Sequence, residues 1–108
     1  YFNDTWEYDG TVWTRVEDIG PAPRDSFGFS YNGKVILLFG GTDAGNAFRD
    51  TWQWDGSNWT QRQDIGPAAR APAGSAYDGL RKRFVIFGGS PAGSGATLGD
   101  TWEAFERP

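Results

Sequence analysis

Three aspartates, each opening the motif Asp-Thr-Trp, are the first residues in this chain whose type and spacing could do chemistry. They are Asp4, Asp50 and Asp100, separated by 46 and then 50 residues. Carboxylates bind metal ions and act as general acids or bases, but a glycosidase needs two of them converging on one cleft. One carboxylate per repeat shows no such convergence. We therefore expect these side chains to bond backbone amides in the turn before a strand, and we predict no catalytic residue.

The arginines and tryptophans are the other candidates. Arg24 and Arg70 could bind an anionic ligand, but we expect each to fix the entry to a strand by bonding carbonyls or stacking on an aromatic ring. Tryptophans could form a sugar-stacking platform. Because they recur in phase, which a core needs and a single binding site does not, we expect them to pack sheet on sheet. The six are Trp6, Trp13, Trp52, Trp54, Trp59 and Trp102.

Composition narrows the function classes. The chain of 108 residues has no His and no Cys, which excludes imidazole and thiol catalysis and disulfides. Its formal net charge is −4 with scattered basic residues, so we predict no nucleic-acid partner. No apolar run reaches the ~20 residues of a membrane-spanning helix, so we predict no membrane partner. Two Gly-rich stretches lack the Gly-Lys-Ser/Thr ending of a phosphate loop, and we predict no cofactor and no metal.

The Asp-Thr-Trp motif belongs to a longer internal repeat. Superimposing Asp4 on Asp50 aligns the two segments without a gap through Gly33 and Gly79, and a two-residue insertion follows in the second copy. The apolar run VILLFGG at 35–41 then matches RFVIFGG at 83–89. This is a tandem array with a period near 50 residues.

Each period contains four strand-like pieces, so the predicted class is all-β. In the first full period these are 26–32, 34–41, 51–56 and 58–63. The first alternates aromatic with small or polar residues, as a half-buried strand does, and the second is a continuous apolar run typical of a strand covered on both faces. Asn-Gly and Asp-Gly pairs mark the hairpin turns.

These residues resemble the kelch repeat, the unit of about 50 residues that forms one four-stranded blade of a β-propeller. Many kelch-like blades carry a His three residues after the repeated Arg, where this chain has Phe27 and Ala73. The resemblance rests on glycine doublets (Gly40-Gly41, Gly88-Gly89), aromatic pairs (Tyr8 with Trp13, Trp54 with Trp59) and Pro-x-x-Arg (Pro21/Arg24, Pro67/Arg70).

The resemblance implies four-stranded antiparallel meanders, with strands a to d counted outward from the propeller axis, and an incomplete ring in one domain spanning 1–108. Residues 1–17 would be strands c–d of one blade, 24–63 a complete blade, and 70–108 strands a–c of the next. The aromatic faces of the end blades would then need neighbouring blades as partners. These could come from a longer chain, which the strand count favours, or from identical copies closing a homo-oligomeric ring. The chain has no Met, so we expect that either a leader was removed or the chain is a piece of something longer.

The expected function is a non-enzymatic binding or scaffold module that presents its b–c and d–a loops to a protein or glycan. The loops are 42–49, 90–99, 17–23 and 63–69, and the candidate contact residues are Asp43, Asn46, Phe48 and Arg49. One alternative is a self-assembling propeller fragment with a purely structural role. Another is a part of a larger propeller oxidase or sugar isomerase whose catalytic residues lie outside this segment. The acidic, Cys-free composition would suit an extracellular or bacterial-envelope protein.

Overall fold

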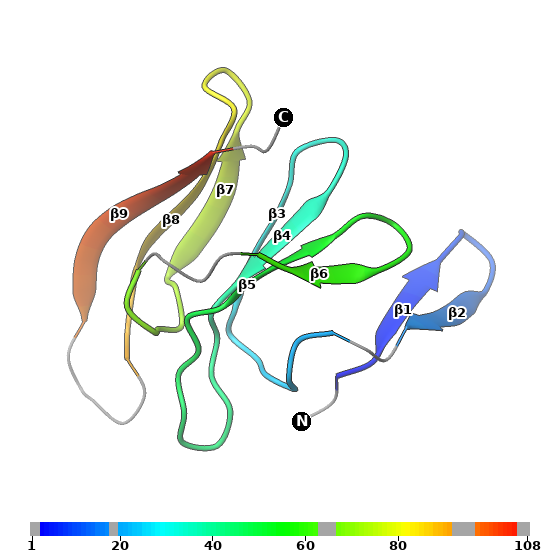
Figure 1. Cartoon of the computed structure of the whole chain (residues 1–108), viewed down its shortest axis with the longest axis horizontal. Helices are drawn as coiled ribbons and strands as arrows, with labels where there is room; N and C mark the ends of the chain where they lie inside the picture. The colour runs from blue at the N-terminus through cyan, green and yellow to red at the C-terminus, as the bar shows by residue number, and fades with distance from the viewer. Residues whose placement is uncertain (1–2, 18–19, 63–66, 92–96, 106–108) are drawn as a thin grey trace.

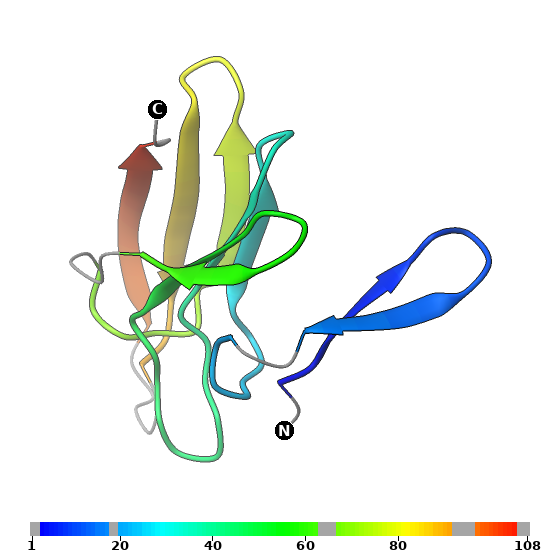
Figure 2. The same cartoon turned by 45° about the vertical axis from the view of Figure 1, so that its right-hand side comes forward.

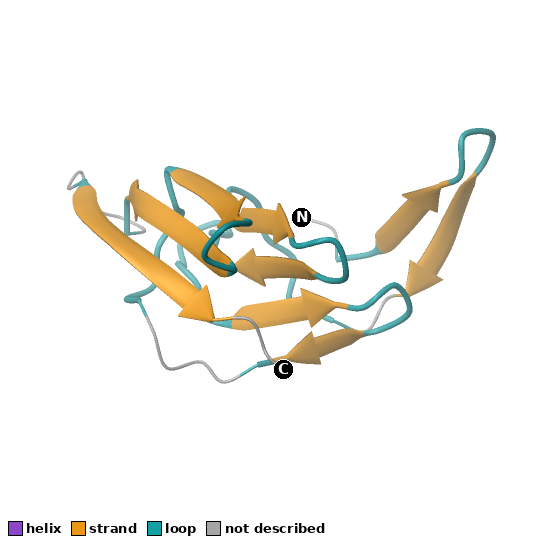
Figure 3. Cartoon of the chain, turned by 90° about the horizontal axis from the view of Figure 1, so that it is seen from above, coloured by secondary structure: helices purple, strands orange, loops and turns teal. Residues whose placement is uncertain are grey.

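The computed structural model describes residues 3–17, 20–62, 67–91 and 97–105. Within these ranges every regular element is a β-strand and none is a helix, as the strands and loops of Figure 3 show. The described part of the chain therefore offers no helix with the length and apolar character needed to cross a membrane. The prediction of an all-β chain is confirmed.

The described residues form nine strands in three antiparallel sheets that follow one another along the chain (Figure 1). The first sheet pairs β1 with β2, the second has the order β3-β4-β5-β6, and the third has the order β7-β8-β9. This two, four and three division is the one expected from the repeat. The bounds are β1 Thr5–Tyr8, β2 Trp13–Glu17, β3 Gly28–Tyr31, β4 Ile36–Phe39, β5 Thr51–Trp54, β6 Trp59–Gln61, β7 Gly74–Asp78, β8 Arg83–Gly89 and β9 Leu98–Phe105.

The hairpins use side-chain oxygens of the turn residues themselves. In the β1–β2 turn, Asp9 Oδ1 accepts the backbone N–H groups of Thr11 at 2.8 Å and Val12 at 2.9 Å. Asp55, Asn32 and Asp78 do the same in the other three hairpins. Such bonds hold the backbone in a tight turn. The predicted Asp-Gly and Asn-Gly turns are therefore present.

The buried core lies in the second sheet. Leu37, Leu38 and Phe39 are consecutive in β4 and each is only 5–6% exposed. Consecutive strand residues point to opposite faces, so β4 is covered on both sides, as its unbroken apolar run predicted. Within the described residues, only Trp54 and Phe84 join them as fully buried apolar side chains.

The first strands of the second and third sheets lie side by side. The backbone N–H of Phe29 in β3 donates to Ser75 Oγ in β7 at 2.9 Å, and Ser75 Oγ donates to the Phe29 carbonyl at 3.3 Å. The loop preceding β7 is joined to the second sheet as well, because the N–H of Gly41 donates to the carbonyl of Arg70 at 2.9 Å. The β1–β2 hairpin instead projects away from the other two sheets (Figure 2).

The glycine doublets bring two backbones into contact. Gly41 and Gly89 have φ near +100°, where side chains are strained. A Cβ on Gly41 would lie 2.6 Å from the carbonyl oxygen of Asp25, and one on Gly89 would lie 2.0 Å from that of Ala71. Their partners in the doublets, Gly40 and Gly88, also have positive φ. The doublets are therefore required by close approach of the loop that leads into the first strand.

The six tryptophans differ in burial, and the three most exposed lie in the two end sheets, whose aromatic faces are expected to need neighbouring sheets as partners. Trp6, Trp13 and Trp102 are 49%, 64% and 40% exposed, whereas Trp54 is 6% exposed. The exposed three belong to the first and third sheets, each of which has a neighbour on one side only. Phe87, in the third sheet, is 50% exposed for the same reason, whereas Phe29, in the second sheet, is 48% exposed on the side that faces β1. The described sheets do not close into a ring.

Candidate functional site

The most elaborate polar arrangement is a clasp between Arg24, Asp50 and Trp52, which we call the first clasp. Arg24 Nη1 donates to Asp50 Oδ1 at 2.6 Å and Nη2 donates to Oδ2 at 3.0 Å. The indole Nε1 of Trp52 donates to the same Oδ2 at 2.8 Å. Two parallel charge-assisted bonds fix both the distance and the angle between the two side chains. The clasp therefore ties the loop before β3 to the start of β5.

The Arg24 guanidinium has three further contacts. Its Nε donates to the carbonyl of Ala22 and its Nη1 to the carbonyl of Gly40, both at 3.0 Å. Its Cζ lies 3.9 Å from the centre of the Phe48 ring. The side chain is only 2% exposed, so these contacts replace water around a buried charge. The expectation that Arg24 bonds carbonyls and stacks on an aromatic ring at a strand entry is confirmed.

A second clasp repeats the first in the third sheet. Arg70 donates to the two carboxylate oxygens of Asp100 at 2.5 and 3.0 Å, and Trp102 Nε1 donates to Asp100 Oδ2 at 2.8 Å. Arg70 Nε bonds the carbonyl of Ala68 at 3.1 Å, with a longer contact of 3.5 Å from Nη1 to the carbonyl of Gly88. The repetition shows that the clasp is part of the framework.

The first sheet contains an incomplete clasp. Trp6 Nε1 donates to Asp4 Oδ2 at 2.9 Å, matching the indole–carboxylate bonds of the other two clasps. Among the described residues, however, no guanidinium is bonded to the Asp4 carboxylate. In the described ranges its sheet consists of β1 and β2, so the inner strand pair whose leading loop carries the arginine in the other two sheets has no counterpart beside β1.

The clasps lower the pKa of their carboxyls. For Asp50, partial burial acts to raise the pKa, but the hydrogen bonds from Arg24 and Trp52 outweigh it, and the pKa lies below the ordinary 3.8. For Asp100, the hydrogen bonds from Arg70 and then Trp102 hold the pKa far below that value. Hydrogen bonds and positive charge both favour the ionised form. These carboxylates are therefore ionised at neutral pH and cannot serve as general acids.

The expected role of these aspartates needs correction. The sequence predicts bonds to backbone amides in the turn before the strand, whereas Asp50 and Asp100 each accept hydrogen bonds from an arginine and an indole. A signal for this was present in the sequence. Residues two apart in an extended chain share a face, so Asp-x-Trp places the carboxylate beside the indole. The arginine recurs in the same phase as the pair, which is what a shared contact requires.

The loop between β4 and β5 carries the four residues expected to contact a partner, and the structure separates their roles. Asp43 and Asn46 form the tip, where Asp43 Oδ1 accepts the backbone N–H of Asn46 at 3.2 Å and its side-chain amide at 3.0 Å. Arg49 is exposed. Phe48 is half-buried beneath Arg24, and its carbonyl accepts the N–H of Arg70 at 3.1 Å. Phe48 therefore belongs to the base of the loop.

The remaining candidate loops are only partly described. In the loop between β8 and β9, residues 92–96 lie outside the described ranges, as do 18–19 of loop 17–23 and 63–66 of loop 63–69. The described parts of the loops that precede β3 and β7 lie at the same end of the molecule as the β4–β5 loop, opposite the β3–β4 and β7–β8 turns (Figure 1).

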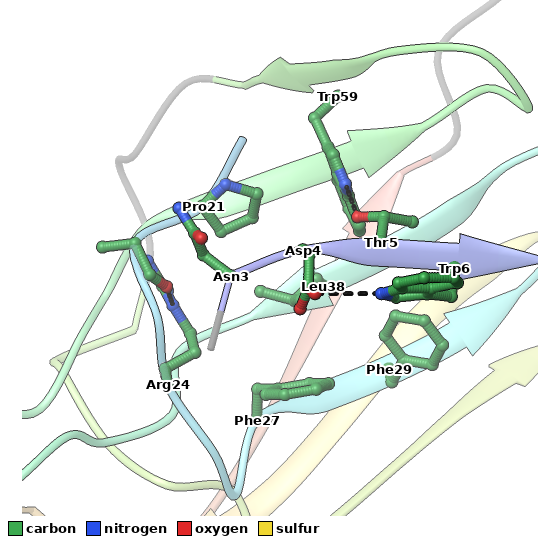
Figure 4. Close-up of a pocket in the computed structure, with 11 residues that line it drawn as sticks. Asn3, Asp4, Thr5, Trp6, Pro21, Arg24, Phe27, Phe29, Leu38 and Trp59 are labelled. Carbon is green, nitrogen blue, oxygen red and sulfur yellow. Dashed lines mark hydrogen bonds between the residues drawn. The ribbon is translucent and has the colours of Figure 1, made fainter. Parts of the chain in front are cut away.

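A cleft of about 240 Å³, which we call the end cleft, separates β1 from the second sheet (Figure 4). Asp4, Thr5 and Trp6 line it on one side, and Phe27, Phe29 and Leu38 are among the residues that line it on the other. It is bridged where Trp59 Nε1 donates to Thr5 Oγ1 at 2.9 Å. The cleft is therefore an opening between two sheets, with aromatic walls and one carboxylate at its edge.

No cluster of three or more metal-ligating side chains occurs in the described part of the chain. No protein-family model matches the sequence, and no curated protein gives a significant match. The geometry of the clasps, the loop tip and the end cleft is thus the basis on which a function can be argued.

Proposed function

We propose that this chain is a segment of a kelch-type β-propeller that works as a non-enzymatic binding or scaffold module. The proposal is supported by the sheet order, in which a four-stranded meander follows two strands and precedes three. The lateral contact of β3 with β7 also fits blades whose first strands line a common axis. Each clasp would then join strand c of a blade to the entry of strand a.

One observation supports the β4–β5 loop as the contact site above all. The residues that repeat in each sheet are used internally, whereas the loop tip is polar, exposed and absent from the repeat. Its base is held by Phe48, packed under the buried Arg24. Variable polar loops on a rigid scaffold are the usual location of binding residues. Asp43, Asn46 and Arg49 offer carboxylate, amide and guanidinium groups to a protein or glycan.

The proposal is tested by screening the full chain against a glycan array and a displayed peptide library. The strongest binder is then titrated against the double variant Asn46→Ala/Arg49→Ala and against Lys34→Ala, which changes an exposed residue at the opposite end. We expect at least a tenfold loss of affinity in the loop variant and no change in Lys34→Ala. The absence of any binder, or equal losses in both variants, would contradict the proposal.

A further inference from the structure

β1 and β9 carry the same residues in the same arrangement. Both read Asp-Thr-Trp-Glu, at 4–7 and 100–103, whereas the equivalent stretch at 50–53 ends in Gln. In both, the tryptophan indole donates to the preceding aspartate, at 2.9 Å in β1 and 2.8 Å in β9. By residue type and local geometry, either strand could occupy the third position of a sheet.

Each of these strands lacks the neighbour that the other has. Among the described strands, β1 pairs only with the outer strand β2, and β9 pairs only with the inner strand β8. β5, their counterpart in the four-stranded sheet, pairs on both sides, with β4 and with β6. Joining β7–β8 to β1–β2 would therefore produce a sheet with the full set of pairings that β5 has.

The arginines that bind carboxylates of β9 could bind the equivalent carboxylates of β1. Arg70 binds Asp100, and Arg81 at the β7–β8 turn forms an ion pair with Glu103. The equivalent residues of β1 are Asp4 and Glu7. The central strand β5 has Gln53 in place of that glutamate, so the match to the basic β7–β8 turn is shared by β1 and β9 but not by β5.

The two ends of the chain expose side chains of different size, large aromatic ones at the β1 end and small ones on β7. At the β1 end, Phe29 and Tyr31 of β3 are 48% and 60% exposed beside the end cleft. On β7, Gly74 and Ala76 are exposed, and a Cβ on Gly74 would meet no atom within 4 Å. The contact between β3 and β7 inside one chain has the same character. There the small residue Gly28 of β3 lies against the third sheet, and a Cβ on Gly28 would contact Ser75 at 3.4 Å.

We infer that β1 of one copy replaces β9 on the β7–β8 pair of a second copy. Arg70 of the second copy transfers from its own Asp100 to Asp4, and Arg81 of the second copy transfers from Glu103 to Glu7. The completed sheet contains β7 and β8 of the second copy followed by β1 and β2 of the first copy. It fills the end cleft of the first copy and covers Phe29 and Tyr31 of that copy. The register would follow the one that places Val85 opposite Glu103, so Val85 would face Glu7. The largest change in side chain comes directly after the shared Asp-Thr-Trp-Glu stretch, where Tyr8 takes the place of Ala104 opposite Phe84.

This association is heterologous, because one end of a copy binds the other end of the next. Such contacts continue until the rotation closes a ring or a filament forms. Most of the pairings lost with β9 are regained with β1, so the gain comes from pairing β2 and from burying the open aromatic faces. The inference requires no ligand on the β4–β5 loop, and it can hold or fail independently of loop binding.

Sedimentation velocity across a range of concentrations tests the inference. The wild-type chain should associate in a concentration-dependent way. Asp4→Asn should weaken association about tenfold or more, because a bidentate ion pair becomes a weaker neutral contact. Asp100→Asn should strengthen it by loosening β9. Asp43→Asn, a matched change in an exposed loop, should have no effect. A monomer at every concentration, or association unaffected by Asp4→Asn, overturns the inference.

A crosslinking measurement keeps the test decisive if Asp100→Asn fails to fold. The chain has no cysteine, so Glu7→Cys and Val85→Cys can be prepared separately and mixed. Directly opposed residues have Cβ atoms about 5 Å apart, within reach of a short bismaleimide. We expect heterodimers from this mixture and at most background from Glu7→Cys mixed with Leu80→Cys, which lies at the exposed turn. Equal yields from the two mixtures overturn the inference.

Discussion

Replacing Asp50 by Asn in the first clasp should destabilise the protein substantially. The Arg24 side chain is 2% exposed and that of Asp50 is 20% exposed, so the change leaves a buried guanidinium without its countercharge. Removing one partner of a fully buried pair costs about 3–5 kcal/mol. Asn keeps one acceptor and part of the site meets water, so we expect a loss of about 2 kcal/mol in the free energy of unfolding.

A loss of that size is readily measured in a chain of 108 residues. Domains of this length have unfolding free energies of about 5–15 kcal/mol, and a change of ~2 kcal/mol lowers the melting temperature by roughly 10 °C. Urea unfolding followed by tryptophan fluorescence gives the value. Asp43→Asn is the matched control, because this half-buried carboxylate at the loop tip forms no ion pair with an arginine in the described structure and its Oδ1 acceptor is retained.

A double variant distinguishes the cost of an unpaired buried charge from the cost of any substitution at these two positions. Arg24→Met with Asp50→Leu removes both charges and leaves apolar groups, so no buried charge stays uncompensated. It should be less destabilised than Asp50→Asn alone. The reasoning is refuted if Asp50→Asn loses less than about 0.5 kcal/mol, the range of ordinary surface changes, or if the double variant is the worse of the two.

Three further outcomes follow from the structure. Because its arginine partner lowers the pKa of Asp100, this group contributes stability above pH 4 that is lost as pH falls below 4; the acid unfolding profile of Asp100→Asn should therefore be flatter than that of the wild type. Gly89→Ala should destabilise far more than Gly56→Ala, measured by thermal unfolding, because both have φ near +100° but only the first meets a backbone oxygen. Thr5→Val and Trp59→Phe should each cost about 1 kcal/mol, and the double variant in a mutant cycle should cost less than their sum, because both remove one hydrogen bond.

Much of the sheet structure could be predicted from the sequence because it depends on local chemistry. The alternation before Tyr31, the unbroken apolar run ending at Phe39 and the Asn-Gly and Asp-Gly turns each act within a few residues. The four strands of the first full period begin and end inside the predicted ranges, whereas β9 begins at Leu98, within the stretch predicted as loop 90–99. The role of Arg24 could be predicted in kind, since a cation repeated at a strand entry has few other uses.

The partners of the repeated side chains could not be read from the repeat alone. A period shows that Asp50 has an equivalent in Asp100, but it does not say which distant group each one meets. The arginine lies 26 residues away in one clasp and 30 in the other, because the second copy has insertions. The sequence places Phe48 with the polar residues of the loop tip for a related reason. Its place beneath Arg24 depends on how the loop folds back, which the surrounding polar residues do not reveal.

Burial was the hardest property to predict. Trp6 and Trp52 occupy equivalent positions, yet Trp6 is 49% exposed. The difference lies in whether another sheet stands beside the strand, and this depends on the position of the repeat in the chain and not on the residue.

Successive sheets pack against one another in chain order, and the function and the association proposed for the chain both depend on this packing. Nuclear Overhauser effects in the isotope-labelled chain test it directly. We expect cross-peaks between the Trp59 indole proton and the Thr5 side chain, which join the first and second sheets, and between the Phe29 amide proton and the Ser75 side chain, which join the second and third. Strong cross-strand signals inside each sheet, with neither of these two contacts present, would contradict it.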